Sequence, residues 1–228
     1  MMRLRELKDC VTGEPYLRGE DGREYRRAAC ALCWPAPPLP GCVVALGEAR
    51  RAPTVAGTER RHLHLLFEEW SDSPRALIDH AERALRLCRA RRAVTPDDDP
   101  RIALVDAAND ARREERLPPL RTEPPLAWHG QGEGLLPYYL SLLHARVVDA
   151  KTLHLGTDSR LPASIAQADS PDIPARTAML RWPGLCALGW AVEALDMLPM
   201  REWGREWGRN RSARPTGMEG PADMLGGY

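Results

Sequence analysis

Short apolar runs and helical spacing alternate along the middle of the chain. Three apolar segments with β-branched or alternating side chains predict three strands, at residues 42–46, 53–57 and 62–67. Ser71-Asp72-Ser73-Pro74 follows them and combines a helix N-cap with a proline at the first helical position. Apolar residues then recur at helical spacing as far as Cys88, so we expect an amphipathic helix here.

Later apolar segments continue this succession of strands and helices. Ile102-Ala103-Leu104-Val105 is uniformly apolar, which predicts a buried strand that ends at Asp106. The pattern further predicts a helix over residues 135–145, a short strand over 152–155 and a helix over 184–198. A strand, a helix and a strand within about 60 residues are typical of a βαβ unit, which places two parallel strands side by side.

Composition changes at both ends of this region. Residues 1–41 are irregular and end in the Pro-rich run 34–41, which predicts an N-terminal extension with a polyproline-like linker. Residues 201–228 begin with a tandem Arg-Glu-Trp-Gly repeat and become rich in Gly and Pro, which predicts a mobile tail. We therefore expect one α/β domain over residues 42–200 between these two segments.

Bulk composition narrows the classes of function. The chain has 228 residues, of which 43% are hydrophobic and 28% charged, as in ordinary globular proteins. Basic and acidic residues balance at 32 each, so overall charge gives no argument for nucleic-acid binding. No apolar run is long enough to span a membrane, and the N-terminus lacks the apolar core of a secretion signal. We expect a cytoplasmic protein with no membrane partner, in which the six cysteines are not a disulfide framework.

Four carboxylates lie where the predicted elements would bring them together. The order of those elements is that of an RNase H-like fold, a mixed sheet flanked by helices in which three antiparallel strands precede parallel strands and helices. Glu48 follows the first predicted strand and Asp106 the fourth, and the ends of neighbouring parallel strands converge. Glu193 and Asp196 are three residues apart and therefore adjacent on the last predicted helix. Glu48, Asp106 and Asp196, with Glu193 as the alternate third ligand, would hold two Mg²⁺ or Mn²⁺ ions for phosphodiester hydrolysis. Acidic residues are also common after strands simply because they bind water there, so both interpretations stay open.

Within that fold, the chain resembles the nuclease domain of the viral terminase large subunit over roughly residues 42–200. The resemblance rests on Val43-Val44-Ala45-Leu46-Gly47-Glu48, on Leu65-Leu66-Phe67-Glu68-Glu69-Trp70 followed by Ser73-Pro74 and a helix, and on Ile102-Ala103-Leu104-Val105-Asp106-Ala107-Ala108-Asn109. It implies a metal-dependent DNA endonuclease with a two-metal mechanism, with Asp106 as the best-matched ligand.

Two departures from the family pattern support an alternative interpretation. The family has an aspartate at the end of the first strand, where this chain has Gly47 and Glu48, and adjacent aspartates in the late cluster, where this chain has Glu193 and Asp196. The alternative is a catalytically degenerate structural or regulatory protein of viral or mobile-element origin that kept the fold.

Cysteine and histidine residues provide a third hypothesis. Cys30 and Cys33 form a CxxC motif with Cys10 before and Cys42 after, and four thiolates can bind structural zinc. A zinc-stabilised nucleic-acid-binding adaptor built around residues 1–42 would follow, whereas buried thiols are the simpler interpretation. His62 and His64 would share one face of a strand, as a metal pair or as an exposed polar face, and His129 lies in a Gly-rich loop that would border a site.

Arginine clusters are the remaining candidates for contact with DNA. They lie at Arg60-Arg61, from Arg89 to Arg92, and from Arg201 to Arg214. In the last cluster, Trp203 and Trp207 would stack on bases or pack against a protein partner through the C-terminal tail. A solvated surface neutralised by glutamates is the alternative.

Overall fold

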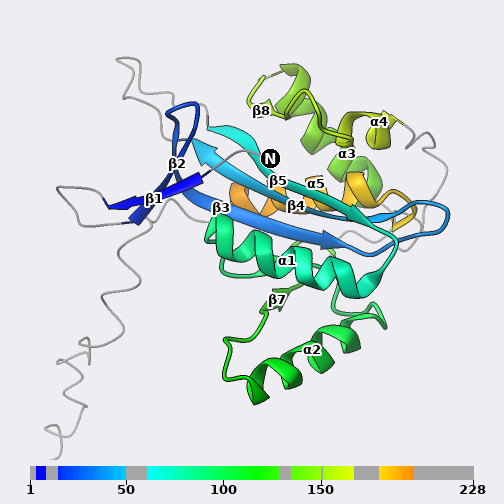
Figure 1. Ribbon diagram of the computed structural model, residues 1–228. Coiled ribbons are helices and arrows are strands. Elements are labelled where there is room, and N and C mark those ends of the chain that lie inside the picture. The colour runs from blue at the N-terminus through cyan, green and yellow to red at the C-terminus, as the bar shows by residue number, and fades with distance from the viewer. Residues whose placement is uncertain are drawn as a thin grey trace, which may run out of the picture.

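Three long strands that follow one another in the chain form the centre of the sheet. They are β3 (Glu24–Cys33), β4 (Gly41–Ala49) and β5 (His62–Ser71), and they pair antiparallel (Figure 1). The register runs from Cys33↔Cys42 at one end of the β3–β4 pair to Tyr25↔Ala49 at the other. The computed structural model describes residues 4–8, 15–49, 61–128, 135–149, 151–166 and 180–197.

Short strands extend this meander on both sides. β2 (Pro15–Gly19) pairs antiparallel with the start of β3, and β1 (Leu4–Lys8) pairs antiparallel with β2. β6 (Ala93–Val94) pairs parallel with the end of β3, and β7 (Thr122–Glu123) pairs parallel with β6. β8 (Leu153–His154) lies parallel to β5 on the opposite side of the sheet. The sheet is therefore mixed and mostly antiparallel.

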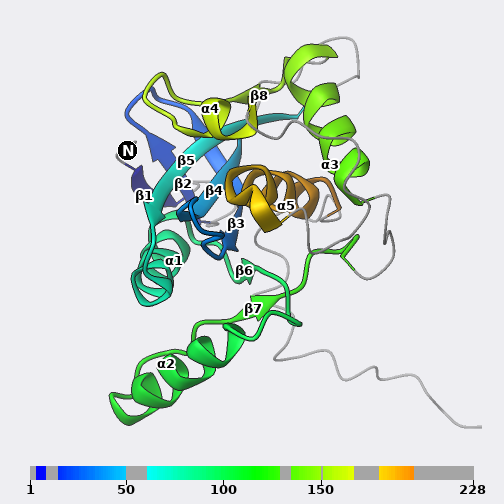
Figure 2. The ribbon, with the colours of Figure 1, turned by 90° about the vertical axis from the view of Figure 1, so that its right-hand side faces the viewer.

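Helices flank both faces of the sheet. α1 (Pro74–Cys88) packs against β3, β4 and β5 on one face, and α5 (Pro183–Met197) packs against β3 and β4 on the other (Figure 2). α2 (Ile102–Glu114) extends away from the sheet below α1. α3 (Leu135–His144) continues into the π-helical turn η2 (Ala145–Asp149), and both lie with α4 (Leu161–Ala166) on the α5 side.

Alternating side chains divide the interior into two cores that share one sheet. From Ala28 to Cys33, successive residues of β3 belong in turn to the core under α1 and the core under α5. Both faces are covered, so these strands carry apolar side chains on both sides, as buried strands do. Each fully buried leucine, such as Leu77 of α1 or Leu188 of α5, contributes about 1.5–3 kcal/mol.

The Pro-rich run is a turn within the sheet. Ala36 and Leu39 form a bridge in which each N–H donates to the other residue's carbonyl, at 3.0 and 2.8 Å. The run therefore joins β3 to β4 as a hairpin, and the prediction of an irregular extension that ends at residue 41 is wrong for β3, which is a central buried strand. A boundary at residue 41 would divide the sheet itself.

Several other predicted elements match the structure. The helix over residues 74–88 is present, with Ser73 as its N-cap, and the helices near 135–145 and 184–198 and the strand near 152–155 are confirmed within a few residues. Residues 102–105 are not a strand but the first turn of α2. The strand predicted at 53–57 and the tail at 201–228 lie outside the described residues.

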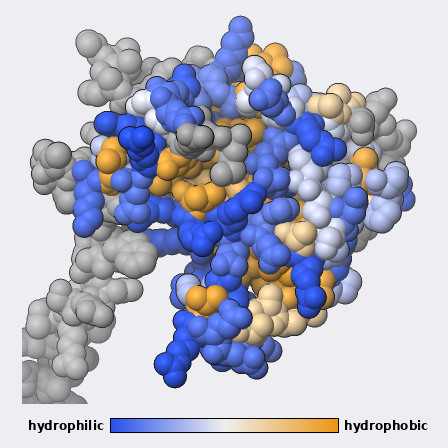
Figure 3. All heavy atoms as spheres, viewed as in Figure 1, coloured by the Kyte–Doolittle hydropathy of each residue, from blue (hydrophilic) through white to orange (hydrophobic). Residues whose placement is uncertain are grey.

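Among the described residues, no helix is both long and apolar enough to cross a bilayer. Hydrophilic residues cover most of the face seen in Figure 3, with small apolar patches between them.

Candidate functional site

Glu48 lies near the end of β4, on the face that α5 covers, and is held by two arginines. Its register partner on β3 is Arg27, whose Nη1 lies 3.1 Å from Glu48 Oε2. Arg61, just before β5, places its Nε 3.8 Å from Glu48 Oε1. The carboxylate is largely shielded from solvent, so both ion pairs lie in surroundings that screen them weakly.

Asp196 lies in the last turn of α5 and is held by a third arginine. Arg146 of η2 forms an ion pair with Asp196 and donates to the backbone carbonyl of Arg61 at 2.9 Å. Arg27 reaches the same end of the helix and donates to the carbonyl of Leu195 at 2.9 Å. The last turn of α5 is thus tied to both η2 and β3.

Arg27 connects the two carboxylates electrostatically. Burial lowers the pKa of this guanidinium, whereas the charges of Glu48 and Asp196 both raise it. Arg27 contacts Glu48 and the carbonyl of Leu195, the residue before Asp196, which is consistent with the prediction that Glu48 and Asp196 lie near one another. Three guanidiniums nevertheless face two carboxylates, and such a cluster repels a divalent cation while it already neutralises the oxygens that would bind it.

Asp106 lies apart from these acids. It is an exposed residue of α2, which extends away from the sheet, so its prediction as the end of a buried strand is wrong. Four consecutive apolar residues fit the first turn of a helix as well as a short strand. Only Val105 of that run is buried, and it packs in the core under α1.

Glu193 is the most deeply buried of the four predicted acids, with 1% of its surface exposed. Its carboxylate accepts hydrogen bonds from the backbone N–H groups of Leu126 and Ala127, at 3.0 and 3.1 Å, and from the Tyr139 hydroxyl at 2.8 Å. Burial, and then the adjacent carboxylate, raise the pKa of Tyr139 well above its usual value, so this phenol stays a donor. These hydrogen bonds to Glu193 hold the 124–128 loop and α3 against α5.

Gly189 makes the approach of α3 to α5 possible. A Cβ at this position would lie 2.8 Å from Cδ1 of Tyr139, which is closer than side chains pack. The glycine is therefore what lets the Tyr139 ring lie over α5 and its hydroxyl reach Glu193.

The true ends of the parallel strands lie elsewhere than predicted. β3 and β6 are parallel neighbours and end at Cys33 and Val94. The acidic residues that follow β6 have partners of their own: Asp98 accepts from Trp128 Nε1 at 2.9 Å, and Asp99 binds the guanidinium of Arg101. The run Asp97-Asp98-Asp99 is the sequence feature that could have located this edge, but a two-residue strand gives too little pattern to be recognised.

The four cysteines proposed for zinc are divided between different places. Cys30 and Cys33 are three residues apart on a strand, so they point to opposite faces, Cys30 toward Cys88 under α1 and Cys33 toward Cys186 under α5. Cys42 lies opposite Cys33, and Cys10 lies outside the described residues. A CxxC motif brings its thiols together on a turn or helix end, which this strand is not.

Three histidines, His62, His64 and His154, lie together where β5 pairs with β8. The rings of His62 and His64 both stack on that of His154, with centroids 5.0 and 4.4 Å apart, so they share a face as predicted. Burial, and then His154, lower the pKa of His64 to about 4, which keeps it neutral at pH 7. His62 Nδ1 and His154 Nε2 lie 2.7 Å apart and share a hydrogen bond, so these two nitrogens already use each other as partners, which argues against a metal pair.

Within the described part of the chain, no three His, Cys, Asp or Glu side chains are grouped so that they could hold a metal ion.

Among the arginine clusters, Arg89 pairs with Glu6 and Arg92 with Glu123. His129, Arg60 and the cluster from Arg201 to Arg214 lie outside the described residues.

Arg27 and Arg146 were not predicted from the sequence, although they pair with Glu48 and Asp196 and so determine the charge of the site. Arg27 becomes a candidate only once residues 24–33 are recognised as a strand that pairs with Glu48. Arg146 is 50 residues from Asp196, and no local pattern connects the two.

Comparison of the chain with family models, with curated proteins and with solved structures finds no match.

Proposed function

We propose that the chain has an RNase H-like topology and serves as a non-catalytic structural or regulatory protein. The topology is supported by an antiparallel meander, β3–β4–β5, followed by two strands that lie parallel to β3 in succession. It is also supported by the position of the last helix, α5, on the face opposite α1.

The observation that carries the non-catalytic role is the pairing of Glu48 and Asp196 with arginines. Two-metal hydrolysis needs carboxylate oxygens that are open to hard cations. Here Arg27 and Arg61 form ion pairs with Glu48, and Arg146 forms one with Asp196, so both carboxylates already have cationic partners. A metal would have to displace partly buried guanidiniums and leave them without counter-ions, which costs several kcal/mol for each buried charge.

The ends of β3 and β6 support the same conclusion. The carboxylates that follow β6 are already used by partners of their own, Asp98 by Trp128 and Asp99 by Arg101. The adjoining core under α5 consists of buried apolar side chains and thiols, among them Cys33 and Trp190. Trp128 packs edge-on against Trp190, with ring centroids 5.7 Å apart. This packing leaves an apolar interior where a nuclease of this topology keeps its charged site.

A Mg²⁺- or Mn²⁺-dependent DNA endonuclease is the second candidate. The order of strands and helices favours it, as does the shared proximity of Glu48 and Asp196 to Arg27. It requires that Arg27, Arg61 and Arg146 release Glu48 and Asp196 when DNA is present and bind the DNA phosphates instead.

Cleavage and metal binding by the full chain distinguish the two candidates. We expect supercoiled, linear and single-stranded DNA to stay intact with Mn²⁺ or Mg²⁺, and the melting temperature to be the same with Mn²⁺ as with EDTA, since a bound ion would raise it. Glu48→Gln and Asp196→Asn should lower the melting temperature, because each leaves an arginine without its counter-ion.

The nuclease candidate predicts the opposite set of results. Cleavage that EDTA stops, that Glu48→Gln and Asp196→Asn abolish, and that the matched exposed change Asp110→Asn leaves intact would overturn the non-catalytic proposal. Loss of the same cleavage in Asp106→Asn would in addition place Asp106 in the site despite its position on α2.

A further inference from the structure

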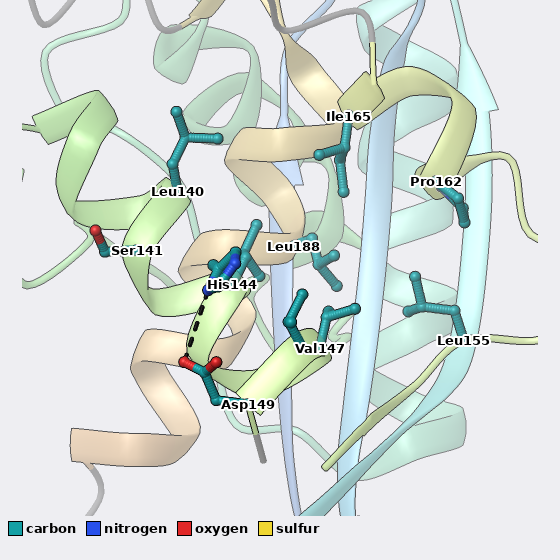
Figure 4. A pocket seen from close by; sticks show the side chains of 11 residues that line it. Leu140, Ser141, His144, Val147, Asp149, Leu155, Pro162, Ile165 and Leu188 are labelled. Atoms are coloured by element: carbon teal, nitrogen blue, oxygen red, sulfur yellow. Dashed lines mark ion pairs between the residues drawn. The ribbon is translucent and has the colours of Figure 1, made fainter. Parts of the chain in front are cut away.

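A large apolar pocket lies on the α5 side of the molecule. Its volume is about 780 Å³, and its walls are α3, η2, α4 and the segment after β8, with Leu188 of α5 among the lining residues. Figure 4 shows Leu140, Val147, Leu155, Ile165 and Leu188 around this space, with the ion pair of His144 and Asp149 at one side. We call it the α3–α4 pocket.

The pocket exposes apolar surface at one of its walls. Val147 and Val148 of η2 are 48% and 53% exposed, and they are neighbours on this wall. Isolated exposed apolar residues are common, but adjoining ones that border a concave apolar space mark a surface that is covered in the working protein. The volume falls within the range of about 300–1,000 Å³ that is usual for occupied sites.

The chain leaves α5 beside this wall. Asp196, one residue before the end of the helix, forms an ion pair with Arg146, which directly precedes Val147. Leu188 lies nine residues before the end of α5, a distance of about 14 Å along the helix axis at 1.5 Å per residue. The end of α5 therefore lies close to this wall of the pocket.

The segment that follows contains apolar anchors at a suitable distance. Trp203 and Trp207 are the sixth and tenth residues after Met197, so an extended chain carries them up to about 20 and 35 Å from the helix end. Each indole brings about 150–250 Å² of surface to be buried. The Asp149 carboxylate at the side of the pocket is exposed, with the imidazole of His144 3.6 Å away, and attracts the arginines of the repeat, Arg201 and Arg205.

We propose that the α3–α4 pocket is the docking site for the chain's own Arg-Glu-Trp-Gly repeat, residues 201–208. Trp203 and Trp207 bury their indoles against the exposed apolar wall of Val147 and Val148, with Arg201 and Arg205 toward Asp149. The tether makes the encounter intramolecular, so modest contacts suffice for occupancy. The proposal does not depend on whether the protein cuts DNA.

Tryptophan quenching in the full chain tests this docking. Acrylamide quenching is compared between the wild type and Trp203→Phe/Trp207→Phe, and the difference reports the accessibility of these two indoles. We expect them to be several-fold less accessible than free tryptophan. Val148→Asp should expose them, and Val147→Asp should do the same, since both positions are half-exposed and tolerate a charge. Leu104→Asp is the matched control, because Leu104 is 43% exposed on α2, away from the pocket.

The outcomes separate the possible occupants. Shielded indoles that both valine variants expose, at a protein concentration where the chain is monomeric by gel filtration, support docking within one chain. Indoles that are as accessible as free tryptophan in the wild type overturn it. Shielding that persists in both valine variants places the repeat elsewhere and also overturns it. Shielding that disappears on dilution, together with a dimer, assigns the pocket to the repeat of a second copy instead.

Discussion

A single buried carboxylate links three separate segments of this protein. Glu193 on α5 has 1% of its surface exposed, and its hydrogen-bond donors come from the 124–128 loop and from α3. A carboxylate is expensive to remove from water, and these charge-assisted hydrogen bonds offset that cost. Glu193 therefore holds the loop and α3 against α5, and its oxygens are used in these hydrogen bonds rather than open to a ligand.

Removing the charge of Glu193 should destabilise the fold. We expect Glu193→Gln to lower the free energy of unfolding by about 1.5–3 kcal/mol, the usual strength of a hydrogen bond to a charged group, because its amide group turns a donor toward donors. Tyr139→Phe should cost about 1–2 kcal/mol, since two backbone donors remain. Urea unfolding of the full chain measures both. The exposed Asp110→Asn is the control and should change stability by less than about 0.5 kcal/mol. Equal stability of Glu193→Gln and wild type would show that the carboxylate is not what holds the loop.

The position of Glu193 was predictable from the sequence, but its role was not. Its place on one face of a helix follows from the spacing of the apolar residues around it. Its partners Leu126 and Tyr139 are 67 and 54 residues away, and nothing in their own surroundings indicates that they donate to a carboxylate. Glu48 and Arg27, beside the last turn of the same helix, pose the same difficulty.

At the scale of elements, the joint between β3 and β4 depends on a glycine. A Cβ at Gly41 would lie 2.6 Å from the Cys33 carbonyl oxygen, from the Pro35 nitrogen and from Leu77 Cδ1. Two of these atoms are backbone, so neither can move without disturbing the turn. Gly41 therefore sets how closely β4 begins beside the end of β3 and beneath α1.

Gly41→Ala should destabilise the protein by about 1–3 kcal/mol or more, the usual cost of overpacking. In a chain of this size that corresponds to a melting temperature lowered by about 2–4 °C for each kcal/mol. Gly156→Ala is the matched control, since a Cβ there meets nothing within 4 Å. Thermal unfolding of the two variants beside the wild type measures the difference. A Gly41→Ala protein as stable as Gly156→Ala would mean that the turn relaxes freely.

Elements with strong local signals were predictable, and those defined by distant packing were not. Ser73-Pro74 and the regular spacing of Leu77, Ile78 and Ala81 identify α1 without help from the rest of the chain. β3 reads Glu-Tyr-Arg-Arg-Ala-Ala-Cys-Ala-Leu-Cys, with no β-branched residue, and becomes a strand because β4 and β6 pair with both its edges. α2 begins with the apolar run Ile102–Val105, and its helical state is decided by its surroundings rather than by that run.

At the scale of the whole molecule, two apolar cores meet through one sheet. Three thiols, those of Cys33, Cys42 and Cys186, lie in the core under α5, and those of Cys30 and Cys88 lie in the core under α1. All five are buried. Burial raises the pKa of the Cys88 thiol to about 12 and that of Cys42 well above its usual value. Thiolates, the reactive form, are therefore scarce in both cores at neutral pH.

These thiols should report the opening of each core separately. In the full chain carrying Cys10→Ser, we expect a thiol reagent such as Ellman's reagent to modify none of the five cysteines in the native state and all five in denaturant. Because β3 and β4 contribute side chains to both cores, neither layer can open without unpairing strands that the other needs, so unfolding should be one cooperative step. At intermediate urea, mass spectrometry of the labelled peptides should then give one common rate for the five positions. Earlier labelling of Cys30 and Cys88 than of Cys33, Cys42 and Cys186 would contradict this, because it would mean that the α1 layer separates from a sheet that α5 still holds.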